Sequence, residues 1–229
     1  MRNFFPFLPS FPARGSSIPP LALAAGPGAV CGISACLALT GLVAPASLPA
    51  IVAPIGASSV LVFAVPASPL AKPRAVIMGN TLSAAVGVLV SLVVSQPMLA
   101  AGLAVGLAIF VMSVTRSLHP PGGAAALTAV LMHPSTTGLE TAFLFPLVPV
   151  GVNSVVLVCT GMLFHRFSGH SYPHHAVPVS PQTETAAGLL HEDILAALQK
   201  TGETFDIEIE DLERLLVLAE AHKKERLPT

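Results

Sequence analysis

Long apolar runs, separated by short polar breaks, fill the chain from about residue 20 to about residue 165. Because about 20 consecutive apolar residues cross a bilayer, each run predicts one membrane span, and the short loops favour antiparallel neighbours. The predicted spans are 21–43, 48–66, 75–95, 97–115, 119–138 and 142–164. The pattern therefore predicts an all-α, polytopic transmembrane helix bundle with about six crossings.

Composition supports the same class. The chain is 53% hydrophobic and 10% charged, whereas soluble domains carry roughly 25% charged residues. This composition indicates an integral membrane protein with the lipid bilayer as a partner, and no nucleic-acid partner is expected. Cys31, Cys36 and Cys159 all lie inside predicted spans, where cysteine usually serves as a small packing residue.

The charges are segregated along the chain. Through Arg166 the chain has six Lys and Arg side chains and one acid, Glu140, a net charge of +5. The rest of the chain has five Lys and Arg side chains and eleven Asp and Glu side chains, a net charge of −6. With six crossings and the N-terminus inside, all six basic residues fall on the cytoplasmic side, as the positive-inside rule requires. If the segment after Leu118 were re-entrant, there would be five crossings and the tail would lie outside; six are preferred.

The N-terminal residues 1–20 lack the features of a secretory signal, because prolines interrupt any apolar core. They are expected to form an interfacial segment. A bacterial inner membrane, with both termini on the cytoplasmic side, is the expected location.

The stretch SLHPPGGAAAL, residues 117–127, interrupts the fifth apolar run. Prolines and glycines at bilayer depth persist only where they are buried in protein or line a polar cavity. Pro120 and Pro121 suit the first turn of a helix, and Gly122 and Gly123 let the backbone approach a ligand closely. The N–H groups of Gly122, Gly123 and Ala124 would then form a helix start that favours a small anion. His119 can donate to that anion or carry a coupled proton.

A weak internal repeat extends this prediction. Gly56, Ala57 and Ser58 open the second span as Gly123 and its neighbours open the fifth, and a GxxxG motif precedes each segment. An Asn follows each, Asn80 and Asn153. Two halves of three crossings would form a 3+3 inverted repeat with broken helices, as in many transporters. Gly56, Ala57 and Ser58 would then be a matching cradle, and the two Asn side chains would bond between helices or contact substrate.

Three cations flank the predicted site. Lys72 and Arg74 either attract anions to the cytoplasmic mouth or act only as topology signals. Arg116, three residues before His119, is expected to face the permeation path. The predicted substrate-binding residues are His119, Pro120, Pro121, Gly122, Gly123, Ala124, Gly56, Ala57, Ser58, Arg116, Asn80 and Asn153, with Lys72 and Arg74 for anion attraction.

The block GASSVLVFAVPASPLAKPRAVIMGN, residues 56–80, followed by LHPPGGA, residues 118–124, resembles the HPP family of membrane proteins. The likeness covers about residues 20–165. Plastid and cyanobacterial members of that family are assigned nitrite transport, so the resemblance implies an anion transporter. The family is usually described with four spanning helices, fewer than the six predicted from the apolar runs.

The C-terminal part forms a separate unit. Residues 166–188 are predicted to be a linker, in which His170, His174 and His175 form either a metal site or, with preference, a surface polar cluster. No metal and no cofactor are expected. Residues 189–229 carry two amphipathic stretches at helical spacing and are predicted to form a cytoplasmic helical hairpin. Two such helices bury too little surface alone, so a homo-oligomer or contact with the membrane domain is expected.

Two functional classes remain. The first is a transporter or channel for a small inorganic anion, with nitrite in first place. The alternative is a non-transporting membrane scaffold or regulatory subunit whose C-terminal helices bind a partner. An enzyme is not expected, because the spans show no acid pair, Cys/His couple or metal constellation.

Overall fold

The computed structural model describes residues 20–132, 138–175, 191–201 and 205–226. The predicted interfacial segment and most of the predicted linker lie outside these ranges. Every regular element in the described residues is helical, so the predicted all-α class is confirmed. The elements are α1 (Pro20–Val43), α2 (Ala53–Ala64), η1 (Pro69–Ala71), α3 (Pro73–Val93), α4 (Pro97–Val114), α5 (Pro120–Leu131), α7 (Leu139–Leu144), η2 (Pro146–Val152), α8 (Asn153–Ser168), α9 (His191–Thr201) and α10 (Ile209–Arg226).

Four helical stretches in the described chain are long and apolar enough to cross a membrane. Three are α1, α3 and α4, and the fourth is the continuous run from Leu139 to Ser168 through α7, η2 and α8. The middle of that run, η2, is a π-helix that contains Pro146 and Pro149. Proline lacks the N–H that an α-helical turn needs, and π-turns occur as local insertions in α-helices.

The second and fifth predicted spans form shorter helices than expected. Both α2 and α5 have 12 residues, which gives a length of about 18 Å against a hydrocarbon core of about 30 Å. Residues 44–52, where a span was predicted to begin, are not helical. Pro45 and Pro49 fall in this stretch, and proline ends a helix because it has no N–H to donate. The expectation of irregular starts is met, whereas the expectation of two full-length spans is wrong.

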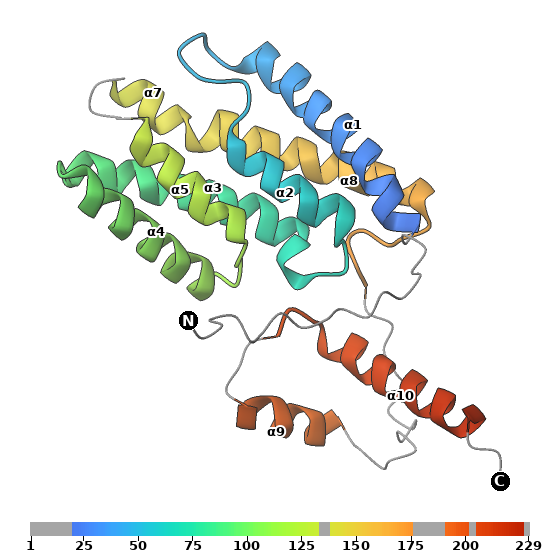
Figure 1. Ribbon diagram of the computed structural model, residues 1–229. Helices are drawn as coiled ribbons and strands as arrows, with labels where there is room; N and C mark the ends of the chain where they lie inside the picture. The colour runs from blue at the N-terminus through green and yellow to red at the C-terminus, as the bar shows by residue number, and fades with distance from the viewer. Residues whose placement is uncertain (1–19, 133–137, 176–190, 202–204, 227–229) are drawn as a thin grey trace, which may run out of the picture.

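The described chain nevertheless alternates between the two ends of the bundle. At one end, Arg74 of α3 donates to the Thr115 carbonyl after α4 at 3.1 Å, and Phe164 near the end of α8 packs beside Phe63 near the end of α2. At the other end, Thr141 of α7 bonds Ser47 after α1. Residues 44–72 and 115–132 therefore lead from one end of the bundle toward the other, each with one half-length helix (Figure 1).

The centre of the domain is a close contact between α3 and α5 (Figure 1). A Cβ added at Gly79 would lie 2.7 Å from the His119 Cβ, and one at Gly87 would lie 2.3 Å from the Ala126 carbonyl oxygen. Small residues allow the backbones of membrane helices to approach this closely. This contact fixes His119 against the second turn of α3.

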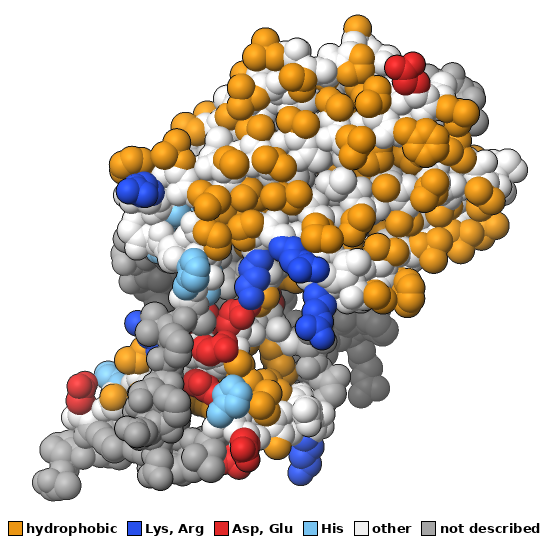
Figure 2. Space-filling view, turned by 180° about the vertical axis from the view of Figure 1, so that it is seen from behind, with side chains coloured by type: hydrophobic (Ala, Val, Ile, Leu, Met, Phe, Trp, Pro, Cys, Tyr) orange, Lys and Arg blue, Asp and Glu red, His pale blue; other side chains and the backbone are white. Residues whose placement is uncertain are grey.

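Helices α9 and α10 lie in the segment for which a hairpin is predicted, beyond one end of the bundle (Figure 1). An apolar groove of about 260 Å³ lies between them and includes Ile194, Leu198, Leu212 and Leu216. Figure 2 shows a densely apolar body, with Lys and Arg side chains gathered where this body meets the tail.

Candidate functional site

His119 is the N-cap residue of α5 and is fully buried. Its Nδ1 lies 2.8 Å from the carbonyl oxygen of Leu70 in η1. Because a carbonyl oxygen only accepts, Nδ1 carries the hydrogen and donates it. The other ring nitrogen, Nε2, lies 2.8 Å from the Ser58 hydroxyl of α2. In the neutral ring Nε2 accepts, so Ser58 donates to it. His119 thus joins α5, η1 and α2.

Two further buried side chains complete what we call the His119 cluster, which consists of His119, Ser58, Asn80 and Ser154. The Asn80 amide of α3 donates to the Ser58 Oγ at 2.9 Å and to the Ser154 Oγ of α8 at 3.2 Å. All four side chains are fully buried. Among the residues that the structure describes, Asn80 Oδ1 and Ser83 Oγ have no hydrogen-bond partner. The cluster therefore has an unused acceptor at Asn80, and the Ser83 hydroxyl, one turn later in α3, is an unused donor.

The Ser58 hydroxyl has a second acceptor within reach. Its Oγ lies 3.1 Å from the carbonyl oxygen of Pro54, one turn earlier in α2. If the His119 ring takes up a proton, Nε2 donates to Ser58 Oγ and the Ser58 hydroxyl can turn to Pro54. The hydrogen-bond geometry therefore leaves neither ring nitrogen unpaired in either protonation state.

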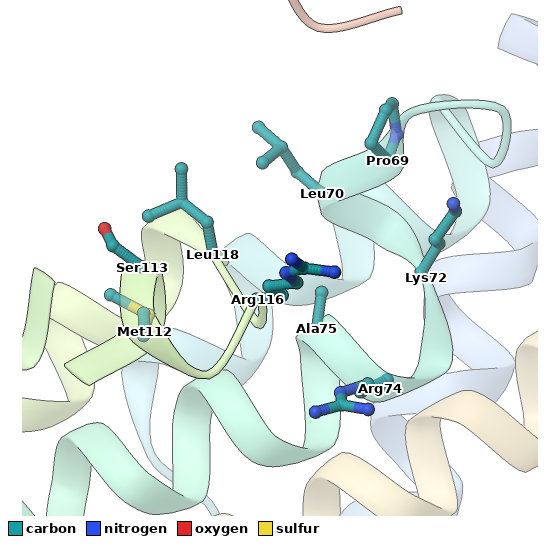
Figure 3. Close-up of a pocket in the computed structure, with 9 residues that line it drawn as sticks. All are labelled: Pro69, Leu70, Lys72, Arg74, Ala75, Met112, Ser113, Arg116 and Leu118. Atoms are coloured by element: carbon teal, nitrogen blue, oxygen red, sulfur yellow. The ribbon is translucent and has the colours of Figure 1, made fainter. Parts of the chain in front are cut away.

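A pocket of about 410 Å³ lies beside this cluster, and we call it the basic pocket (Figure 3). It is lined by Pro69, Leu70, Lys72, Arg74, Ala75, Met112, Ser113, Arg116 and Leu118. Three of these residues are cations and none is an acid. Leu70 belongs to both features, because its side chain lines the pocket and its carbonyl binds His119. Clustered charge of one sign in a pocket with apolar walls raises the local concentration of counter-ions.

The turn between α4 and α5 brings Arg116 into this pocket. Arg116 has a φ of 51°, the left-handed region that few non-glycine residues adopt. The chain reverses sharply there, and Arg116 lies between the α4 end and the side that carries Lys72 and Arg74 (Figure 3). Arg74 is held by its bond to the Thr115 carbonyl. The predicted cations Lys72, Arg74 and Arg116 are thus brought together.

The family model for the transmembrane region of HPP proteins matches residues 17–173 of this chain. The chain belongs to the HPP transmembrane family. The predicted resemblance is therefore confirmed. The matched region contains the whole His119 cluster and the whole basic pocket.

Two transmembrane proteins of Dictyostelium discoideum are similar to this chain. One is 40% identical over 136 residues, which cover 56% of this chain and 46% of the relative. The other is 39% identical over 116 residues, which cover 49% of this chain and 36% of the relative. The chain thus spans less than half the length of the curated relatives that it matches. No solved structure matches this chain.

Only some of the residues predicted from the HPP motif and from the cradle at 56–58 lie at the site. Several predicted residues point outward, since Pro120, Ala124, Gly56 and Ala57 are exposed. Pro121 is buried and Gly123 is half-buried. The predicted helix start at Pro120 is present. Of the predicted cradle in the second span, Ser58 is the residue that reaches His119.

Gly122 has a different surrounding from the one expected. Its N–H donates to the His119 carbonyl at 2.8 Å, so this donor is used inside the helix start. A Cβ at Gly122 would lie 2.8 Å from the Gly79 carbonyl oxygen and 2.9 Å from the Ser83 Oγ. Gly122 therefore permits the close approach of α5 to α3 and has no open space for a ligand.

Asn153 lies in a second, separate polar centre. Its amide nitrogen donates to the carbonyls of Ala50 at 2.8 Å and Pro149 at 2.7 Å, and its Oδ1 accepts from Thr40 at 2.9 Å. All its hydrogen-bonding groups are used between α1, the 44–52 segment and the last long helix. This arrangement matches the predicted use of Asn153 in bonding between helices.

Sequence reasoning assigned no site role to Ser154, to the Leu70 carbonyl, or to the close-contact residues Gly79, Ser83 and Gly87. Ser154 follows Asn153 directly, and only Asn153 was predicted to be a site residue. Gly79, Ser83 and Gly87 recur every four residues, and this spacing is a readable sign of a close helix contact. The Leu70 carbonyl carries no sequence signal, because every residue has one.

Proposed function

We propose that this chain is a transporter or channel for a small inorganic anion, with nitrite as the first candidate. The observation that carries the proposal is the position of the basic pocket. It lies at one end of the apolar bundle, lined by three cations and no acid, and shares Leu70 with the buried His119 cluster. The anion is attracted to the cations and then meets polar groups inside the bundle.

The His119–Leu70 hydrogen bond is the proposed barrier between the pocket and the cluster. When it opens, the ring N–H, the Ser58 hydroxyl and the Asn80 amide are donors that can replace part of the anion's hydration. Donors at close quarters with little competing water are the usual basis of selectivity in membrane pores. No cofactor, metal or enzymatic step is part of the proposal.

The proposed topology places the basic pocket on the cytoplasmic side. Lys72, Arg74, Arg116 and Arg166 lie at the ends of elements that share one end of the bundle, whereas Glu140 lies in the first turn of α7 at the opposite end. The positive-inside rule then puts both termini in the cytoplasm. A bacterial inner membrane and a homo-oligomer remain part of the proposal.

The proposal is tested by nitrite influx into liposomes that hold the purified protein. The variant is Arg74→Gln with Arg116→Asn, because Asn tolerates the left-handed conformation at position 116. The matched control is Arg166→Gln, an exposed cation at the same end that does not line the pocket. We expect influx at low nitrite to fall about five- to tenfold in the variant, through loss of electrostatic attraction, and to be unchanged in the control.

The alternative function, a non-transporting scaffold, is favoured by the apolar groove between α9 and α10. It predicts no flux of nitrite, nitrate, formate or bicarbonate in the wild type, with or without a pH gradient. Equal influx in the double variant and the wild type would keep a transporter but discard the basic pocket as its mouth.

A further inference from the structure

An acidic stretch of the tail contacts the rim of the basic pocket. We call residues 206–211 the acidic segment. The Glu208 carboxylate lies 2.7 Å from the Nζ of Lys72, one of the three pocket cations. The Asp206 carboxylate accepts the Ser68 hydroxyl, with oxygen distances of 2.8 and 3.0 Å. The charge that would attract an anion at Lys72 is thus already paired with a carboxylate of the same chain.

A third contact holds the other end of the segment. His174, which follows α8, bonds the Asp211 carboxylate at 2.7 Å. Three side chains, Ser68 and Lys72 beside the basic pocket and His174 after α8, therefore hold three acids of one short segment. The charges agree with this docking, since the chain is +5 through Arg166 and −6 beyond it.

The acidic segment is also tied to the turn that holds His119. Ser68 is the N-cap of η1, where its Oγ accepts the Leu70 N–H at 3.1 Å while its hydroxyl faces Asp206. The carbonyl of the same Leu70 accepts from His119. One three-residue turn thus connects the tail to the cluster inside the bundle.

We propose that the acidic segment is a tethered inhibitor of the basic pocket. It competes with the permeating anion for Lys72 and holds η1 in the position that keeps the His119–Leu70 bond closed. This inference rests on the proposed anion transport and names its regulation.

The contact is suited to reversible release. The Lys72 and Glu208 side chains are 46% and 22% exposed, and ion pairs with such exposure are weak and screened by salt. An anion at sufficient concentration, or raised ionic strength, can therefore displace the segment without unfolding the domain.

The first test uses the full chain in liposomes. Glu208→Gln, Asp206→Asn and the double variant are compared with Glu192→Gln, which removes the same charge from the exposed first turn of α9. The concentration of nitrite for half-maximal influx is expected to fall about two- to fivefold in the first three, the range for a partly exposed pair. The control is expected to match the wild type.

The second test locks the segment in place. Ser68→Cys and Asp206→Cys are combined after Cys31, Cys36 and Cys159 have been replaced by serine or alanine. Oxidation is expected to form the cross-link and reduce influx, and a reductant is expected to restore it. Influx that is the same in the oxidised, reduced and Glu208→Gln proteins would overturn the inhibitor while leaving the transporter. Absence of influx in the wild type and in the Glu208→Gln and Asp206→Asn variants would overturn both.

Discussion

The two halves of the membrane domain have the same plan but different polar centres. Each has a long helix, a 12-residue helix and another long stretch, and the second half starts at the end of the bundle opposite to the first. This is the polarity that the predicted inverted repeat requires. In the second half, Asn153 has every hydrogen-bonding group used. In the first, Asn80 keeps an oxygen without a partner in the described chain.

This difference distinguishes buried polar groups whose hydrogen bonds are all used from those that can still form one. A saturated amide holds helices together and has no donor left for a passing anion, whereas one turn after Asn80 the Ser83 hydroxyl is a donor without a partner in the described chain. Asn80 and Asn153, at corresponding positions of the two halves, thus have different hydrogen-bonding environments.

The largest effect is expected where the halves meet, at His119. His119→Gln is expected to lower nitrite influx at least tenfold, because it removes the imidazole from between Ser58 and Leu70. The matched control is His165→Gln, since His165 is also buried and also bonds a hydroxyl and a carbonyl, those of Ser168 and Val62. Because both variants lose similar hydrogen bonds, their denaturation temperatures in detergent should be similar. Nitrite influx should fall only in His119→Gln. Equal influx in the two would remove His119 from the path.

The two asparagines are expected to give opposite rankings. Asn153→Ala should destabilise the domain by about 1–3 kcal/mol, because buried partners lose their bonds, with influx per folded protein nearly unchanged. Asn80→Ala should lower influx about five- to tenfold with the smaller stability loss. Thermal denaturation and nitrite influx, measured on the same preparations of both variants, test these two rankings. If both variants lose stability and influx alike, the distinction between the two centres fails.

The GxxxG motifs sharpen the comparison further. A Cβ at Gly32 would lie 2.7 Å from Phe63 ring carbons, whereas Gly106 has nothing within 4 Å. Gly32→Val is therefore expected to cost about 1–3 kcal/mol through overpacking, and Gly106→Val should leave the fold intact. Denaturation of the purified variants measures this. Size-exclusion chromatography of Gly106→Val also tests the expected oligomer, because an exposed GxxxG face can pair in a bilayer.

The smallest effects are expected at the exposed helix starts. Gly56 has no atom within 4 Å of an added Cβ, and at Gly123 the nearest atom lies at 3.8 Å. Alanine at either position should change stability by no more than about 1 kcal/mol. If influx nevertheless falls in either variant, close backbone approach to the anion is supported at that position. Gly122→Ala is the contrasting case, because its Cβ would meet the Gly79 carbonyl at 2.8 Å.

Helix positions were largely predictable from apolar periodicity and proline. The predicted 21–43 and 97–115 match α1 and α4 within one residue, because the apolar runs end at polar or proline residues. The half-length of α2 was missed because residues 44–52 are apolar, although Pro45 and Pro49 are sequence signals of a break. The use of the Ala50 carbonyl by Asn153 depends on the folded bundle and carries no sequence signal.

Most side chains of the candidate site were predictable from the sequence, but the backbone contact that links them was not. His119, Ser58, Asn80 and the three cations were named from residue type and spacing, and the structure brings them into two adjacent groups. The link between the groups is the Leu70 carbonyl, a backbone atom that no pattern marks. The docking of Asp206 and Glu208 was equally hidden, because it depends on how a distant segment folds back.

The position of the domain's carboxylate has a bioenergetic consequence. Glu140 is the one acid up to Arg166, and it is exposed on α7, remote from the basic pocket. A negative-inside potential of about 100 mV opposes entry of a monovalent anion by about 2.3 kcal/mol, roughly a fiftyfold concentration ratio. On the proposed function, uptake against this potential needs a larger anion gradient or a cation, such as a proton, that travels with the anion, and a proton on this route would meet the His119 imidazole. Without that proton, the resting potential drives anions from the basic pocket outward, and the same architecture works as an exporter.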